Sequence, residues 1–321
     1  MSAPRVVTLG EALGLFSTAG PDGLDRAEHA RIATGGAEAN VAIGLARLGI
    51  DVAWLGRVGE DELGRRIVRE LRAEGVHTAA IQDAAAPTAL MLKDSSRPGR
   101  TTVRFYREGS AGSRLEVADV SRLDISSASW LHITGIALGI SGSARDAILH
   151  AVQVAVENDV SISFDVNHRA SLWGYSDAAP WYRRVAATAS VVFGGDDELR
   201  AMVTAPDDST PHQLAAQIAA QGPGEVVVKL GDRGAGVLAD GAWLERPAQP
   251  ARVIDTVGAG DAFVAGYISA RLNHATVSEA LDRALKTGAA ACQHPGDWEG
   301  ALRMHDLHAA DDTLRVDPVQ R

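Results

Sequence analysis

The sequence predicts an α/β fold, in which a doubly wound, mostly parallel sheet is flanked by helices and carries a small β lid. Short apolar segments alternate along the chain with longer segments of helical periodicity, a pattern typical of parallel sheets covered on both faces. Two stretches, residues 12–34 and 87–108, break this alternation. Insertions after early strands project beyond the carboxyl ends of such sheets, where ligands bind, so we interpret the two stretches as a lid. A plain surface excursion is the alternative.

The first strand and the first helix expected from the sequence illustrate this alternation. Residues 6–10, VVTLG, are too few for a helix and suit a buried strand, whereas residues 37–48 place Val41, Leu45 and Leu48 on one helical face. The same pattern predicts further strands and helices at residues 51–56, 61–75, 130–134, 143–158, 160–165, 190–194, 196–203, 211–221, 225–231, 258–272 and 277–293.

Two hairpins complete the expected elements. Residues 87–108 contain the turn signal Arg97-Pro98-Gly99, and residues 234–245 alternate around Asp240-Gly241. We therefore expect one α/β domain over residues 1–310, with the lid inserted in it. The polar residues 311–321 are expected to form a flexible tail.

Composition and charge exclude several classes of function. With 41 acidic and 31 basic residues the net charge is −10, which disfavours a nucleic-acid partner. No window of about 18 apolar residues and no signal peptide is present, so we expect no membrane partner. The single cysteine, Cys292, cannot form an internal disulfide. These features together predict a cytoplasmic protein.

The stretch DTVGAGDAF, residues 255–263, combines an anion cradle with a carboxylate. Gly258, Ala259 and Gly260 let backbone N–H groups approach one point at the start of a predicted helix, whose dipole adds positive charge there. A dinucleotide fingerprint would need glycine where Phe263 stands, and no Gly-Lys pair of a P-loop occurs.

Asp261 gives this cradle a chemical use. A carboxylate beside bound phosphate is useful if it accepts a proton from an attacking hydroxyl, so the two features together suit phosphoryl transfer. The alternative is structural: Asp261 is a first-turn acid favoured by the helix dipole, and the glycines only allow a tight turn.

Three motifs resemble the ribokinase-like (phosphofructokinase B) carbohydrate kinases. They are DTVGAGDAFVAGY (255–267), GGAEANVAIGLARLG (35–49) and GRVGEDELG (56–64), and the resemblance extends from residue 8 to about residue 296. It implies an ATP-dependent sugar kinase of the ribokinase-like fold. GGAEAN, YREGSAGSRL (106–115) and FDVNHRASLW (164–173) are most similar to 2-keto-3-deoxygluconate kinases.

The resemblance also implies roles for individual residues. Asp261 would be the base, and Gly258, Ala259 and Gly260 the anion hole. A bidentate grip by arginine suits the carboxylate of an acid sugar. The expected sugar-binding residues are Gly35, Gly36, Asn40, Phe105, Arg107 and Arg169. The expected nucleotide-binding residues are Lys229, Gly231, Gly234 and Thr256, with Glu198 as an indirect magnesium ligand.

Structural alternatives exist for several of these residues. Arg107 can be a solvated charge, Arg169 can belong to a structural ion pair, and a simple β-turn explains Gly231 and Gly234 equally well. The histidines lack the spacing of a zinc site.

The chain departs from the family pattern at the substrate and the metal. Met91 and Phe105 stand where lid tyrosines are common, and Gly195 stands where the family has an asparagine, a change for which Asp196 can compensate. The prediction is phosphorylation of 2-keto-3-deoxygluconate, or of an acid sugar with another hydroxyl pattern, to the 6-phosphate.

The remaining expectations concern cofactors, partners and rival functions. The resemblance implies ATP and Mg²⁺, allows a monovalent cation, and suggests a homo-oligomer formed through the lid. The alternatives to the acid-sugar kinase are a kinase of a neutral sugar such as fructose or ribose, and a non-catalytic sugar or nucleotide sensor.

Overall fold

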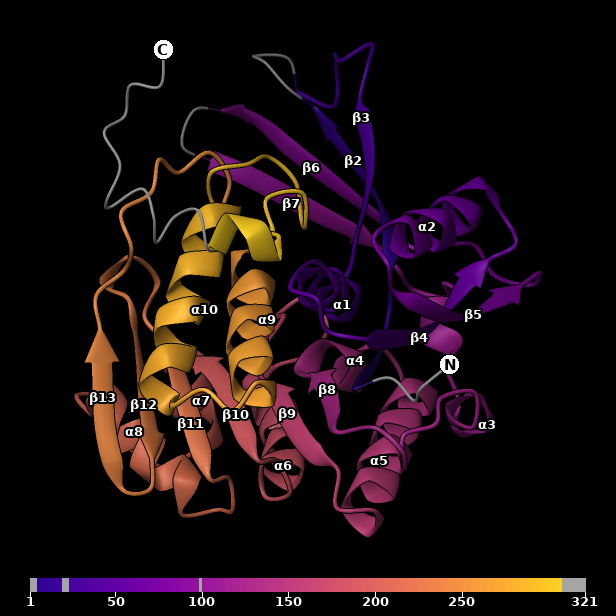
Figure 1. Cartoon of the computed structure of the whole chain (residues 1–321). Helices are drawn as coiled ribbons and strands as arrows, with labels where there is room; N and C mark the ends of the chain where they lie inside the picture. Colours follow the sequence, from indigo (N-terminus) through magenta and orange to yellow (C-terminus); the bar gives the residue numbers. More distant parts are fainter. Residues whose placement is uncertain (1–4, 19–22, 98–99, 308–321) are drawn as a thin grey trace.

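A computed structural model describes residues 5–18, 23–97 and 100–307 of the chain (Figure 1). Nine strands within these ranges form the main sheet. In spatial order they are β13 (Ala242–Arg246), β12 (Ala235–Ala239), β11 (Glu225–Lys229), β10 (Val191–Gly195), β9 (Ser161–Asp165), β8 (Trp130–Thr134), β1 (Val6–Leu9), β4 (Val52–Gly59) and β5 (His77–Asp83). The strands from β11 to β5 are parallel, and β12 and β13 add an antiparallel edge.

The order of the strands reverses between β1 and β8. From β1 the chain moves outward to β4 and β5, then returns to β8 and builds the other half of the sheet. Val6 lies opposite Val52 on one side and Trp130 on the other. In open parallel sheets this switch point opens a crevice at the carboxyl ends of the strands.

Helices cover both faces of the main sheet, and each face has its own apolar core. One face is covered by α1 (Ala37–Arg47), α2 (Glu62–Ala73), α9 (Ala259–Leu272) and α10 (Val277–Ala291). The other is covered by α3 (Val117–Val120), α4 (Gly135–Ile140), α5 (Gly142–Glu157), α6 (Tyr175–Ala186), α7 (Asp196–Met202) and α8 (Pro211–Ala219). Two short 3₁₀ turns, Gly112–Arg114 and Gly231–Arg233, complete the helical elements of the described residues.

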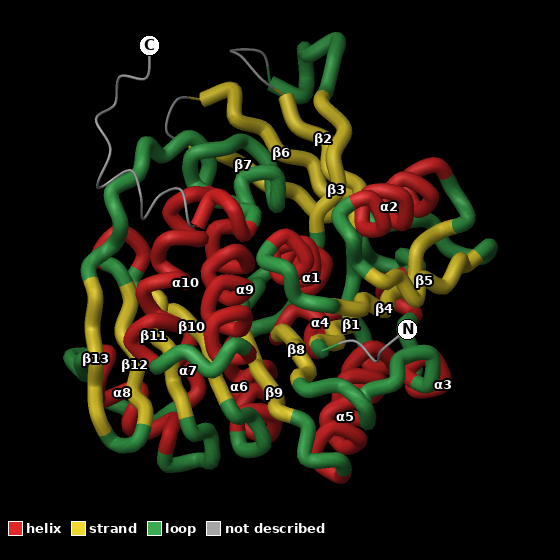
Figure 2. The backbone as a smooth tube through the Cα atoms, viewed as in Figure 1, coloured by secondary structure: helices red, strands yellow, loops and turns green. Residues whose placement is uncertain are grey.

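A second sheet of four strands stands above the main sheet in Figure 2, on the side of α9 and α2. We call it the small sheet; its order is β3 (Arg31–Gly35), β2 (Leu13–Thr18), β6 (Leu90–Arg97) and β7 (Arg100–Tyr106). It is built from the two stretches that break the sequence alternation. Its apolar cluster is small and consists of Leu13, Leu15, Ala33, Ala89 and Met91.

Local sequence explains most of these elements. The Asp61 side chain caps α2 by accepting a hydrogen bond of 2.8 Å from the Gly64 N–H. The turn between β12 and β13 has positive φ at both Asp240 and Gly241, as a two-residue hairpin requires. The fold class predicted from the sequence is confirmed.

The sequence did not predict β5, α3, α4 and α6, and two of its predictions fall on residues outside the described ranges. β5 lies at the sheet edge and is largely half-exposed, so its sequence lacks an apolar run; α6 contains Pro180, which interrupts the helical pattern. Pro98 and Gly99 of the predicted turn, and the predicted tail 311–321, lie outside the described residues. Among the described helices, none has the length and apolar character needed to cross a bilayer.

Candidate active site

A cavity of about 440 Å³ lies at the carboxyl ends of the main-sheet strands, under the small sheet. The main sheet contributes Asp165 and Lys229, and the small sheet contributes Met91 and Phe105. A wider hollow of about 570 Å³ lies along the β5 edge and contains none of the predicted site residues. Most of the predicted site residues therefore line the first cavity, between the two sheets.

The turn that begins α9 is shaped by Gly258. This residue has a φ of 76° in the left-handed region, and a Cβ atom there would overlap the carbonyl oxygen of Asp297, so only glycine fits. The Ala259 N–H donates to the Thr256 carbonyl at 3.3 Å, whereas the N–H groups of Gly260 and Asp261 have no acceptor within the helix. Together with the helix dipole they form a site suited to an anion at the cavity wall.

Asp261 lies in this first turn of α9 and faces the cavity. Its Oδ2 accepts a hydrogen bond of 2.7 Å from Nδ2 of Asn40, a residue of α1 that is 5% exposed. Burial raises the pKa of Asp261 to about 6, and the hydrogen bond from Asn40 opposes this rise. A carboxylate that is ionised near neutrality and held in one orientation is suited to accept a proton.

Lys229 ends β11 and points along the cavity beside Gly260. Its ammonium contacts both carboxylate oxygens of Asp165, at 2.7 and 3.0 Å, and Asp165 ends β9. Burial acts to lower the pKa of Lys229, but the carboxylates of Asp165, Glu198 and Asp261 together outweigh it, so the pKa is raised. Lys229 is therefore a fixed cation next to the α9 turn.

Arg107 lies just beyond β7, at the edge of the small sheet. Its Nε lies 3.0 Å from Oε2 of the buried Glu11, and its guanidinium lies over the Phe105 ring, 4.4 Å from the centroid. Burial raises the pKa of Glu11, against the opposing effects of Arg107 and of a hydrogen bond from Ser110. Glu11 and Phe105 thus fix the plane of the Arg107 guanidinium at the cavity.

Arg169 follows β9 and also lines the cavity. Its Nη1 donates to the carbonyl of His168 at 3.0 Å. The His168 N–H in turn donates to Oε1 of Glu198 at 2.6 Å, and the Gly195 N–H donates to Oε2 of Glu198 at 2.7 Å. Both oxygens of Glu198 therefore bind backbone, and Glu198 supports the loop that carries Arg169.

The predicted magnesium site can be compared with the oxygen and nitrogen donors that the described side chains offer. No cluster of three or more His, Cys, Asp or Glu side chains suited to a metal ion occurs in the described ranges. Asp196, proposed to compensate for Gly195, binds Arg233 at 3.0 Å. Both oxygens of Glu198, the predicted indirect magnesium ligand, accept hydrogen bonds from backbone N–H groups, so the role of Glu198 toward a metal ion stays a prediction.

Most predicted site residues come together at the cavity, and some do not. Those that line it are Gly36, Asn40, Phe105, Arg107, Arg169, Lys229, Thr256, Gly258, Gly260 and Asp261. Ala259, Gly35, Gly231, Gly234 and Glu198 are not among its lining residues. Gly234 has a φ of 113° and a Cβ there would overlap the Arg246 carbonyl, which supports the β-turn alternative. Gly35 leaves space for the Asp297 carboxylate.

Asp165, Asp297 and Glu11 were not predicted from the sequence as residues of the site. Asp165 had a signal, since it ends the buried strand VSISFD at the edge where ligands bind. Asp297 lies in a loop after α10 and had none. It is 6% exposed, and burial together with the neighbouring Asp261 charge raises its pKa to about 7, with Lys93 opposing the rise.

Comparison with known proteins decides the family. A family model described as pfkB family carbohydrate kinase matches residues 3–302. The chain belongs to this family. It is therefore an ATP-dependent sugar kinase, as the sequence motifs predict.

Relatives and structures agree with this assignment. The chain is 36% identical to the 2-dehydro-3-deoxygluconokinase of Bacillus subtilis (strain 168), with 92% of this chain and 91% of that protein aligned. It is 35% identical to the enzyme of the same name from Thermoproteus tenax, over 92% and 90% of the two chains. The crystal structure of a PfkB protein from Polaromonas sp. JS666 superposes with a TM-score of 0.85 and 34% identity, over 96% of this chain and 100% of that one.

Proposed function

We propose that this pfkB-family kinase transfers the γ-phosphoryl group of ATP to the C6 hydroxyl of 2-keto-3-deoxygluconate. The observation that carries the proposal is the meeting of Asp261 with two arginines, Arg107 and Arg169, in one cavity. A neutral sugar has no anionic group for a guanidinium ion to bind, whereas a sugar acid has a carboxylate that an arginine can hold in bidentate fashion. The names of the two relatives support the same substrate.

Asp261 is the general base of the proposed reaction. It takes the proton of the C6 hydroxyl while the oxygen forms a bond to the γ-phosphorus and the bond from that phosphorus to the ADP oxygen breaks. The Asn40 amide holds the receiving carboxylate in one orientation. A pKa of about 6 leaves Asp261 mostly ionised at neutral pH and still basic enough to accept a proton.

The turn Gly258–Gly260 stabilises the charge that develops on the transferred group. Its backbone N–H groups are preorganised, because Gly258 holds a left-handed φ of 76° and leaves no room for a side chain beside the Asp297 carbonyl. The Lys229 ammonium, fixed by Asp165, adds a point charge beside the same turn. A magnesium ion, held by ATP oxygens and water near Glu198, would neutralise further phosphate charge.

The small sheet acts as a lid over the sugar. Its face toward the cavity presents Met91 and Phe105, which lie opposite each other on β6 and β7. These apolar side chains exclude water from the reacting hydroxyl but cannot bind sugar hydroxyls. We therefore expect selection to depend on the carboxylate more than on the hydroxyl pattern.

A panel of sugars assayed for ATP consumption tests the proposal. The panel pairs sugar acids, including 2-keto-3-deoxygluconate and its galactonate epimer, with the neutral sugars fructose and ribose. We expect kcat/KM to be at least 100-fold higher for the best acid than for either neutral sugar. Asp261→Asn should lower kcat by about 10²–10⁴-fold.

Two results would contradict the proposal. Equal efficiency with fructose or ribose would show a neutral-sugar kinase. Absence of ATP turnover with every sugar, in a folded protein, would show a binding protein that does not catalyse. Arg169→Met distinguishes an acid-sugar kinase from a neutral-sugar kinase, because the change should lower kcat/KM for sugar acids and leave kcat/KM for neutral sugars unchanged.

A further inference from the structure

Lys93 is a buried cation on the face of the small sheet that is turned toward the body of the protein. It lies in β6, is 4% exposed, and is in register with Ser17 of β2 and Val103 of β7. Its ammonium forms an ion pair with the Asp255 carboxylate. A buried ammonium is costly unless it is paired, so this contact defines where the strand lies.

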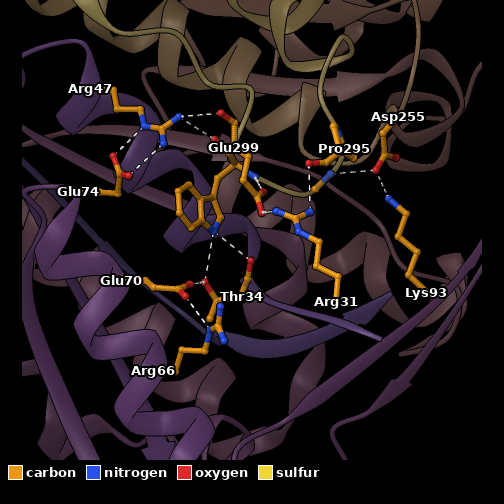
Figure 3. Close-up of polar contacts among 12 residues, drawn as sticks. Arg31, Thr34, Arg47, Arg66, Glu70, Glu74, Lys93, Asp255, Pro295 and Glu299 are labelled. Atoms are coloured by element: carbon orange, nitrogen blue, oxygen red, sulfur yellow. Dashed lines mark hydrogen bonds and ion pairs between the residues drawn. The ribbon is translucent and has the colours of Figure 1, made fainter. Parts of the chain in front are cut away.

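Asp255 joins three separate segments of the chain. Its Oδ2 binds the Lys93 ammonium and also accepts a hydrogen bond of 3.2 Å from the Gly296 N–H (Figure 3). Its Oδ1 accepts a hydrogen bond of 3.2 Å from the Val257 N–H. One carboxylate thus links the small sheet, the start of the glycine turn and the loop of residues 292–301 that follows α10.

The two backbone N–H groups that Asp255 binds belong to Val257 and Gly296, and each residue lies directly before a residue of the candidate active site. Val257 directly precedes Gly258, the residue that sets the α9 turn. Gly296 directly precedes Asp297, whose carbonyl is in contact with Gly258 and which lines the cavity. A displacement of Asp255 would therefore move the anion-binding turn from two sides.

A second tie between the small sheet and the same loop does not pass through Asp255. Arg31 of β3 pairs with Glu299 and donates to the Pro295 carbonyl at 3.3 Å (Figure 3). The Arg31 side chain is 46% exposed, so its ion pair contributes little free energy. Arg31 provides a control, because it joins the small sheet to the same loop through an exposed ion pair and makes no contact with Asp255.

We propose that Lys93 is a positioning residue for phosphoryl transfer, which holds Asp255 and thereby sets the α9 turn when the small sheet lies against the loop. The proposal rests on the proposed function of Asp261 and this turn. Lys93 contacts no reacting atom in this scheme; it acts through Asp255. According to this proposal, the N–H groups of the α9 turn are ordered only when the small sheet lies against the loop and Lys93 binds Asp255.

Lys93→Met tests this role in the full-length protein. We expect kcat at saturating ATP and sugar acid to fall at least tenfold, with KM for ATP changed less than threefold. Arg31→Met should keep kcat within twofold of the wild type. Thermal unfolding of each variant is measured in parallel, and kcat is compared well below the lowest midpoint.

The double variant Lys93→Met/Asp255→Asn distinguishes positioning from general destabilisation. It removes both buried charges, so it should fold even if Lys93→Met alone does not, yet its kcat should remain as low as that of Asp255→Asn alone. A kcat within twofold of the wild type in either folded Lys93 variant overturns the inference. If the wild-type protein phosphorylates no sugar of the panel, the proposed function itself is overturned instead.

Discussion

The main sheet and the small sheet are held in place by different forces. The main sheet has an apolar core on each face, and α9 is buried in one of them, so the turn at Gly258 is fixed by packing. The small sheet has only a small apolar cluster and is joined to the rest of the molecule by ion pairs such as Lys93–Asp255 and Arg107–Glu11.

This difference indicates a division of labour across the cavity. Packing fixes atoms to within a fraction of an ångström, as catalysis requires, whereas the position of the small sheet depends on a few buried charged groups, each of which needs its partner. We expect changes on the α9 side to act mainly on kcat. Apart from Lys93, which acts on the α9 turn through Asp255, we expect changes on the small-sheet face to act mainly on KM for the sugar acid.

Gly258→Ala is the strongest test of the packed side. The added methyl group meets the Asp297 carbonyl and requires a positive φ, so we expect kcat to fall about 100-fold and stability to fall by about 2–4 kcal/mol. Gly49→Ala is the matched control, since Gly49 also has a positive φ, of 75°, but has open space around it. It should cost about 1 kcal/mol and leave kcat unchanged. Equal effects of the two changes in a kinetic and thermal comparison would refute the packing argument.

Arg107→Met tests the small-sheet side. Loss of a charged hydrogen-bond donor should raise KM for the sugar acid about 10–100-fold, with a smaller change in kcat. Arg104→Met is the control, because Arg104 is exposed on the opposite face of the same strand. Steady-state kinetics with both variants decide the point. A fall confined to kcat would place Arg107 with the catalytic groups and break the proposed division.

The pH dependence should show a smaller effect with a defined sign. Asp261 must be ionised to accept a proton, and its pKa is raised to about 6, so kcat/KM should fall as pH decreases through 6 and be about tenfold lower one pH unit below it. KM for the sugar acid should change little, since the arginines remain charged. Asn40→Ala removes a hydrogen bond that favours the ionised form and should move the acid limb to higher pH.

A pH–rate profile of kcat/KM between pH 5 and 8 measures this limb. A flat profile over that range would mean that proton transfer to Asp261 does not limit the rate. An acid limb that stays in place in Asn40→Ala would mean that the Asn40 amide does not act on the titrating group.

Local pattern was sufficient for most of the fold and for the centre of the site. Apolar periodicity predicted the alternating strands and helices, and the glycine turn with Asp261 was evident because both features lie within a few residues. β5 and α6 were missed because an exposed edge and an internal proline weaken the same signals. The orientation of the Lys93 side chain could have been predicted. Lys93 is two residues from Met91, so both side chains lie on the same, inward face of β6.

The sequence by itself determined the sheet, the anion-binding turn and the carboxylate beside it, because each depends on neighbouring residues and on the preferences of glycine and the helix terminus. Only the tertiary structure decided that Asp297 closes on Gly258, that Glu198 supports the Arg169 loop, and that Lys93 meets Asp255 from 162 residues away. These contacts depend on how two sheets and a loop pack together, and no local pattern of residues specifies that geometry.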